Sequence, residues 1–169
     1  IRDKYHLPTT FLLYVGTLQP RKNIPLLIKA FVSYRLRFPD TKLVIVGNKK
    51  AHNFDQTIDE TLASIGGSSD IVFPGYIDEA DLPRIYQMAK TFIFPSLYEG
   101  FAIPLLEAMS QSIPVLASDI PSLREVGGTA VLYFDPKSVD SLVQALYSLE
   151  DSLTRRTELI TQGDRRLEH

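Results

Sequence analysis

Two pairs of charged residues in this sequence have the types and spacing that phosphate and hydroxyl chemistry requires. The basic pair, Arg21 and Lys22, follows an apolar run and a Gly-Thr turn. The acidic pair is Glu99, in a loop behind the apolar run 91–94, and Glu107, with seven residues between the two. Cations neutralise a phosphate leaving group as its bond breaks, and carboxylates accept hydrogen bonds from hydroxyls. The four side chains therefore suit a ligand that combines phosphate with sugar hydroxyls.

The segment around the acidic pair predicts a strand, a loop and a helix in succession. Glu99 and Gly100 fall in the loop, and Glu107 falls about one turn inside the helix. Helix N-termini bind phosphate through unpaired N–H groups and the positive end of the helix dipole. Side chains in a helix lean toward its N-terminus, which aims Glu107 at the same place. We therefore expect the two carboxylates and a helix N-terminus to surround one pocket.

The basic pair is expected to lie in a turn between a strand and a helix. The apolar run 11–15 precedes Gly16 and Thr17, and a helical pattern follows the pair. Glycine at position 16 lets the backbone approach a phosphate without a Cβ in the way. We expect Asn23 to cap the helix, with Pro25 just inside its first turn.

Apolar runs alternate with helical patterns along the chain, which predicts an α/β fold. We expect strands at 11–15, 42–46, 71–73, 91–94, 114–117 and 130–134. The intervening patterns predict helices that include 55–65, 79–89 capped by Asp78, 120–126, 138–149 and 151–166. Such alternation is typical of a Rossmann-like, doubly wound parallel sheet, here of about six strands, with helices on both faces. Ligands of these sheets bind beyond the carboxyl ends of the strands, and both charged pairs follow a strand there.

The overall composition narrows the classes of partner. The 169 residues suit one domain with a core, and the formal net charge of −2 argues against broad binding to nucleic acid or to a membrane surface. Cysteine is absent, as suits a reducing cytosol, and the scattered His6, His52 and His169 lack metal-ligand spacing, so we expect no metal site. No apolar run is long enough to span a bilayer.

The two motifs resemble those of family 4 retaining glycosyltransferases, the glycosyl transferases of group 1, which have the GT-B fold. The stretch EGFAIPLLEAM, which holds Glu99 and Glu107, is similar to the family signature, and VGTLQPRKN precedes it where the family would place it. The likeness covers about residues 11–150 and implies the C-terminal, donor-binding half of such an enzyme. Ala102 stands where the family usually has glycine, and Thr17 stands where many members have arginine.

The resemblance implies a role for each residue of the site. Lys22 would contact the diphosphate with support from Arg21, Glu99 would hold hydroxyls of the transferred sugar, and these three would be the catalytic residues. Glu107 would accept hydrogen bonds from both ribose hydroxyls. The other implied donor contacts are Gly16, Thr17, Gly100, Phe101, Ala102 and Ile103. Tyr76 and Ile77 follow the third predicted strand, either to meet the nucleobase or to serve as core or lid.

The resemblance also carries expectations for the whole protein. It implies transfer of a hexose from a nucleotide sugar to a hydroxyl acceptor without metal or other cofactor. The likeness of VGTLQPRKN to mannosyltransferases favours GDP-mannose and leaves UDP-glucose open. We expect residues 1–166 to be the donor domain, 167–169 to be the remnant of a histidine tag, and the acceptor domain to be an N-terminal one absent from this chain. The isolated chain would then bind donor without transferring sugar, and the full protein would be cytoplasmic, with attachment to the inner face of the membrane left open.

Other functions share parts of this pattern. Another GT-B enzyme, an epimerase or a phosphorylase, would keep the fold, and a phosphorylase would reveal itself by the absorbance of pyridoxal phosphate. A non-catalytic nucleotide-binding module would also keep it, and only activity of the full-length protein separates the two. Paired carboxylates suggest a glycosidase as well, but a glycosidase needs no Gly-Thr…Arg-Lys phosphate site.

Overall fold

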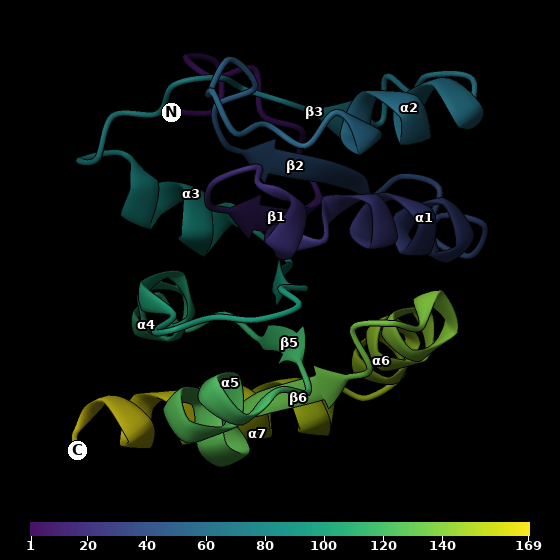
Figure 1. Ribbon diagram of the computed structural model, residues 1–169. Coiled ribbons are helices and arrows are strands. Elements are labelled where there is room, and N and C mark those ends of the chain that lie inside the picture. The colour runs from purple at the N-terminus through teal and green to yellow at the C-terminus, as the bar shows by residue number, and fades with distance from the viewer.

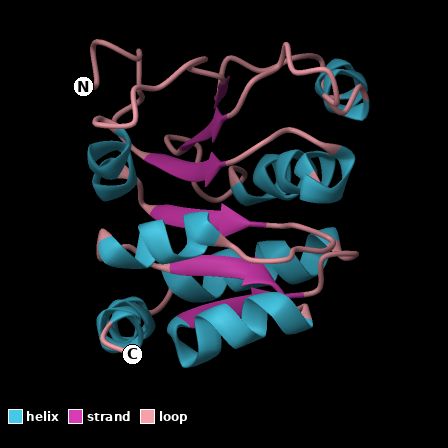
Figure 2. Ribbon diagram, turned by 60° about the vertical axis from the view of Figure 1, so that its left-hand side comes forward, coloured by secondary structure: helices cyan, strands magenta, loops and turns pink.

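A six-stranded parallel sheet forms the centre of the computed structural model, which describes residues 1–169 (Figures 1 and 2). The strands lie in the order β3-β2-β1-β4-β5-β6, and every neighbouring pair is parallel. They are β1 (Phe11–Val15), β2 (Lys42–Val46), β3 (Ile71–Val72), β4 (Thr91–Phe94), β5 (Val115–Ser118) and β6 (Val131–Phe134). The predicted Rossmann-like, doubly wound sheet is confirmed.

Helices cover both faces of the sheet. Helices α1 (Ile24–Tyr34), α2 (Thr57–Ser64) and α6 (Val139–Glu150) pack on one face. The other face carries α3 (Leu82–Met88), α4 (Ile103–Ser110), α5 (Pro121–Gly127) and α7 (Leu153–Leu167), with short 3-10 turns at η1 (Pro20–Lys22) and η2 (Gly128–Ala130). Because helices exclude water from both faces, β1, β4 and β5 are buried along their whole length, which explains their unbroken apolar runs. None of the helices combines the length and apolarity needed to cross a membrane.

The strand order reverses between β1 and β4, which are neighbours although β2 and β3 separate them in sequence. At the carboxyl edge, the segment after β1 and the loop after β4 are joined directly. The backbone N–H of Leu97 donates to the carbonyl oxygen of Arg21 at 2.8 Å, and the Asn23 side chain donates to the carbonyl oxygen of Pro95 at 2.9 Å. Such a reversal is where open α/β sheets form their ligand crevice. The fold therefore brings the two sequence motifs together.

One predicted helix cap is in place without its side-chain bond, and one is wrong. Asn23 occupies the predicted N-cap position of α1, in a left-handed conformation with φ of 62°, but its side chain donates to the carbonyl oxygens of Pro95 and Pro136 and does not bond an α1 amide. Asp78 does not begin a helix, because α3 starts only at Leu82 and the Asp78 carboxylate instead contacts Lys4. In both cases a partner distant in sequence takes the side chain that local propensity would place at a helix terminus.

Candidate functional site

A buried tyrosine, Tyr14, supports the turn after β1 through a hydrogen bond. The Tyr14 hydroxyl donates to the carbonyl oxygen of Thr17 at 2.7 Å, and the Gly16 N–H donates to the carbonyl oxygen of Val46 at 3.0 Å. Burial raises the pKa of Tyr14, so the hydroxyl keeps its proton and remains a donor. A Cβ at position 16 would lie 2.7 Å from the Tyr14 hydroxyl oxygen, so any residue other than glycine would force the tyrosine or the turn to shift. The backbone at Gly16 is therefore held in place by hydrogen bonds and has no side chain in front of it.

Glu99 lies against both members of the basic pair. Its Oε1 atom is 2.8 Å from Nη1 of Arg21, contacts Nζ of Lys22, and accepts a hydrogen bond from the Ser96 hydroxyl at 2.9 Å. The side chains of Lys22 and Glu99 are only 8% and 6% exposed. All three donors bond to the same carboxylate oxygen, Oε1. The other oxygen, Oε2, has no partner within the protein. Glu99 is thus oriented through one oxygen and keeps the other available as an acceptor.

The Lys22 ammonium group lies in a desolvated position. Its Nζ is 4.9 Å from the centre of the Phe94 ring, and burial lowers the pKa of Lys22 while the Glu99 carboxylate opposes that shift. An ammonium group has three N–H donors, and Glu99 occupies one of them. An incoming anion would therefore find a cation that is already stripped of most of its water.

The N-terminus of α4 presents free backbone donors beside this cluster. Ala102 occupies the N-cap position without a side-chain cap, and Pro104 in the first turn has no N–H. The amides of residues 100–103 donate to no backbone carbonyl. Ala102 has a negative φ of −103°, which alanine adopts without strain, so the departure from the family's glycine leaves the local backbone intact. Gly100, Phe101 and Ile103 are exposed, so their N–H groups could reach a phosphate, whereas Ala102 is buried.

Glu107 lies apart from the basic pair, in a second cavity of about 430 Å³. Its Oε2 accepts a hydrogen bond from the hydroxyl of Tyr86 in α3 at 2.9 Å. Burial first, and the Glu107 charge second, raise the pKa of Tyr86, so this tyrosine stays protonated and fixes the carboxylate. Tyr86 was not singled out in the sequence, because a tyrosine within a helical pattern is typical of core. The cavity is lined by Glu79, Leu82, Pro83, Tyr86, Glu107, Ser110 and Gln111.

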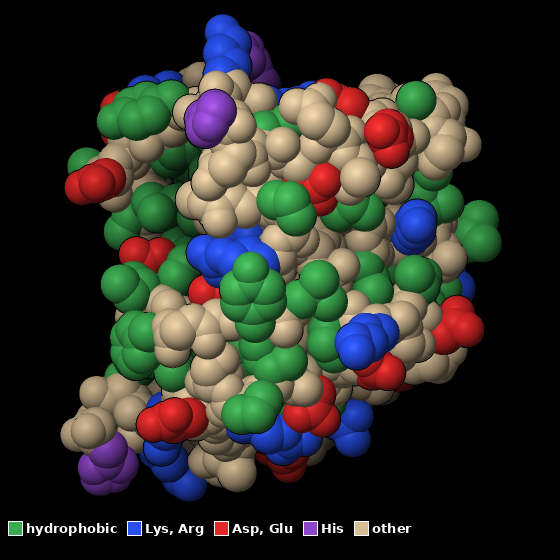
Figure 3. All heavy atoms as spheres, viewed as in Figure 1, with side chains coloured by type: hydrophobic (Ala, Val, Ile, Leu, Met, Phe, Trp, Pro, Cys, Tyr) green, Lys and Arg blue, Asp and Glu red, His purple; other side chains and the backbone are tan.

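A larger cavity of about 640 Å³ lies at the carboxyl ends of β1, β2 and β3. It is lined by Val15, Gly16, Val46, Gly47, Asn48, Lys49, Lys50, Phe73, Gly75, Tyr76, Ile77, Glu79 and Leu82. Tyr76 is 82% exposed at its rim, and therefore is not a core residue. Glu79 and Leu82 line both cavities, so the two lie next to each other. Figure 3, drawn in the view of Figure 1, shows basic side chains among hydrophobic ones in the middle of the visible face, over β1 and the turn that follows it.

Residues 2–166 match the family model described as glycosyl transferases group 1. The chain belongs to this family. A curated relative, the O-antigen chain mannosyltransferase B of Escherichia coli, is 38% identical over 162 residues, which cover 92% of this chain and 41% of the relative. The chain thus spans less than half the length of that relative.

Solved structures share the fold of this chain. Sucrose-phosphate synthase from Thermosynechococcus elongatus superimposes with a TM-score of 0.84 at 26% identity, over 99% of this chain and 43% of that one. The C-terminal domain of a group 1 protein from Francisella tularensis gives a TM-score of 0.81 at 20% identity, over 99% of this chain and 90% of that one. The fold of this group 1 chain is therefore that of a C-terminal GT-B domain.

In this group 1 domain, the residues singled out in the sequence lie along one edge of the sheet in three places. Arg21, Lys22 and Glu99 form one ion-paired cluster beside the N-terminus of α4. Glu107 lies in the smaller cavity, and Tyr76 and Ile77 lie in the larger one with Gly16. The Thr17 side chain is exposed, and only its carbonyl has a defined contact. Nowhere do three His, Cys, Asp or Glu side chains gather in a way that could hold a metal ion.

Proposed function

We propose that this group 1 domain binds the nucleoside diphosphate part of a sugar donor, and that the whole enzyme transfers mannose from GDP-mannose to a hydroxyl with retention of configuration. The observation that carries the proposal is the pair of adjacent cavities, the smaller of which holds Glu107, on the same sheet edge as a desolvated lysine and a helix N-terminus. A nucleotide sugar has the same sequence of parts: base, ribose, diphosphate and sugar.

Each part of the donor has a matching group. The base would occupy the larger cavity between the Gly16 turn and Tyr76, and the ribose hydroxyls would meet Glu107, whose Oε1 is not used by Tyr86. The diphosphate would take the free N–H groups of α4 and the remaining N–H groups of Lys22. The unpartnered Oε2 of Glu99 would accept a hydroxyl of the transferred sugar.

Catalysis would rest on charge placed before the bond breaks. As the glycosidic bond lengthens, negative charge grows on the leaving diphosphate, and fixed donors in a water-poor site stabilise it. In this proposal Arg21 and Lys22 would supply these donors, and their ion pairs with Glu99 would hold both side chains in place. The mannosyl and retaining assignments rest on the sequence motifs and on the relative that is named a mannosyltransferase.

Titration of the chain with GDP, UDP and pyrophosphate tests this proposal. We expect GDP to bind more tightly than pyrophosphate, because base and ribose add contacts in both cavities, and more tightly than UDP. A ligand at about 100 times its dissociation constant should add about 2.7 kcal/mol to the free energy of unfolding. Absence of saturable binding by either nucleotide would overturn the proposal, and a preference for UDP would overturn the assignment of the donor.

Glu99→Gln should bind GDP more tightly than the wild type. The amide keeps one acceptor and a similar shape but removes the negative charge that competes with phosphate for Arg21 and Lys22. We expect a gain of roughly threefold to tenfold, about 0.7–1.4 kcal/mol, and a slower sugar transfer by the full-length enzyme. Calorimetry with GDP measures the first effect. Glu60→Gln on the exposed face of α2 is the matched control, and weaker GDP binding by Glu99→Gln would contradict this role.

A further inference from the structure

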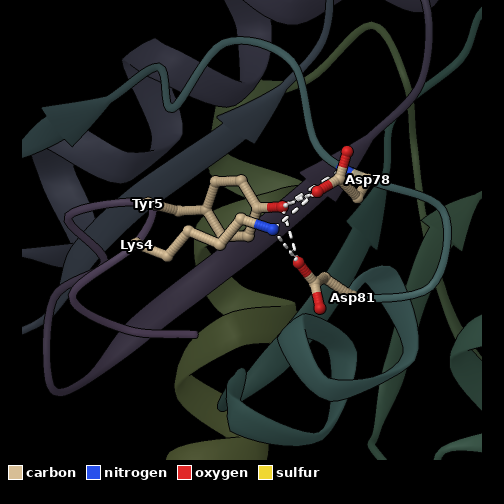
Figure 4. A network of polar contacts seen from close by, with 4 residues as sticks. All are labelled: Lys4, Tyr5, Asp78 and Asp81. Carbon is tan, nitrogen blue, oxygen red and sulfur yellow. Dashed lines mark hydrogen bonds and ion pairs between the residues drawn. The ribbon is translucent and has the colours of Figure 1, made fainter.

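The segment before β1 is joined to the loop between β3 and α3 by a side-chain network (Figure 4). Lys4 Nζ lies 2.5 Å from Oδ2 of Asp78 and 2.7 Å from Oδ2 of Asp81. The Tyr5 hydroxyl donates to Oδ2 of Asp81 at 2.7 Å and accepts from the backbone N–H of Asp78 at 3.2 Å. Lys4 and Tyr5 thus make polar contacts with both ends of the segment 78–81.

The loop that they hold contributes much of the larger cavity. Residues 73–81 connect β3 to α3 without regular structure, and Phe73, Gly75, Tyr76, Ile77 and Glu79 all line the cavity. Residues 73–77 make no backbone–backbone hydrogen bonds with other loops or turns. Gly75 has φ of 79°, a left-handed conformation typical of glycine. The polar contacts that fix this wall of the cavity are therefore concentrated at Asp78 and Asp81.

The anchor belongs in part to the hydrophobic core. Tyr5 is 7% exposed and Leu7 is 5% exposed, and both belong to the hydrophobic core. Lys4 Nζ lies 5.0 Å from the centre of the Tyr5 ring, so the ring also supports the cation. Lys4 first, and the Tyr5 hydroxyl second, hold the pKa of Asp81 below its usual range, which keeps this carboxylate ionised. A core residue therefore carries the hydroxyl that meets the loop.

We propose that Lys4 and Tyr5 are positioning residues for the nucleobase: they hold residues 73–81 in the conformation that forms the base cavity, so the segment before β1 sets the affinity for the nucleotide. This proposal rests on the function proposed above. Neither side chain lines either cavity, so we expect neither to touch the nucleotide. If only a fraction of molecules has the loop in place, the apparent dissociation constant rises by the inverse of that fraction.

The double variant Lys4→Ala/Tyr5→Phe removes the network but keeps the buried ring. We expect its dissociation constant for GDP to rise by about tenfold, which corresponds to the loop being in place in about a tenth of the molecules. Its dissociation constant for pyrophosphate should stay unchanged, because Arg21, Lys22 and the α4 amides lie outside this loop. Lys4→Arg keeps the cation and should bind GDP like the wild type. The matched control is Arg37→Ala, which removes an exposed ion pair with Asp151, away from both cavities.

Amide hydrogen exchange supplies a readout that needs no ligand. In the double variant, amides of residues 73–81 should exchange faster than in the wild type, while those of β1 and β4 should not. If the double variant binds GDP as the wild type does, and its residues 73–81 exchange at wild-type rates, the positioning role is overturned. The proposed function would stand in that case. An equal loss of GDP and pyrophosphate affinity would also overturn it, since that pattern indicates a general loss of structure. Failure of the wild type to bind GDP would instead overturn the proposed function, and the positioning role with it.

Discussion

Lys22→Ala should lower the affinity of the domain for GDP by about ten- to a hundredfold and leave its affinity for guanosine nearly unchanged. A hydrogen bond to a charged group contributes about 1.5–3 kcal/mol. Lys22 is expected to have the full effect because burial has already removed its water, so its contact with phosphate is poorly screened. Calorimetric titration with both ligands measures the difference.

The control for this change is Lys29→Ala, which removes an exposed lysine from the middle of α1. Removing Lys22 also deprives Glu99 of a partner, although Arg21 and Ser96 still bond the same oxygen. Thermal unfolding should therefore accompany the titration. Equal losses of GDP and guanosine affinity would mean that Lys22 is a structural residue and not a phosphate ligand.

Glu107→Ala should weaken binding of the nucleoside part of the ligand and leave binding of the diphosphate part unchanged. We expect it to weaken GDP and guanosine alike, by about tenfold or more, and to leave pyrophosphate binding unchanged, because its proposed partner is the ribose. The change also leaves the Tyr86 hydroxyl, in a residue only 1% exposed, without its acceptor, which costs stability as well. Titration with all three ligands separates the two effects.

Two further variants sharpen this experiment. Glu107→Gln keeps one acceptor and should lose less affinity for guanosine than Glu107→Ala. Tyr86→Phe leaves the carboxylate in the cavity but removes the donor that fixes it, so it should give a smaller loss than Glu107→Ala. If Glu107→Ala weakened pyrophosphate as much as guanosine, the separate ribose role of Glu107 would be wrong.

The parts of the fold that depend on burial were predictable from sequence. Apolar runs such as Phe11–Val15 and Thr91–Phe94 became fully buried strands, because helices on both faces demand side chains that avoid water on both faces. Glycine at position 16 was also predictable as a special position. The reason is now visible in the tyrosine beneath it. Periodicity and strand-end position carry this kind of information.

The parts that depend on distant partners were not predictable. Asn23 and Asp78 have the local chemistry of helix caps, yet their partners lie 72 and 74 positions away in the chain. The pairing of Glu99 with Arg21 joins residues 78 positions apart, and Tyr86 meets Glu107 across two helices. One sequence shows which residue types are present, but the choice among competing partners is made by the packed fold.

A crystal structure of the chain with GDP tests the central claim most directly. The account predicts the base in the larger cavity beside Tyr76, the ribose hydroxyls within about 2.6–3.2 Å of Glu107, and the diphosphate on Lys22 and the α4 amides. Oε1 of Glu99 should remain with Arg21, and Oε2 should face the end of the diphosphate. A nucleotide bound elsewhere on the sheet edge, or with its ribose away from Glu107, would contradict the account.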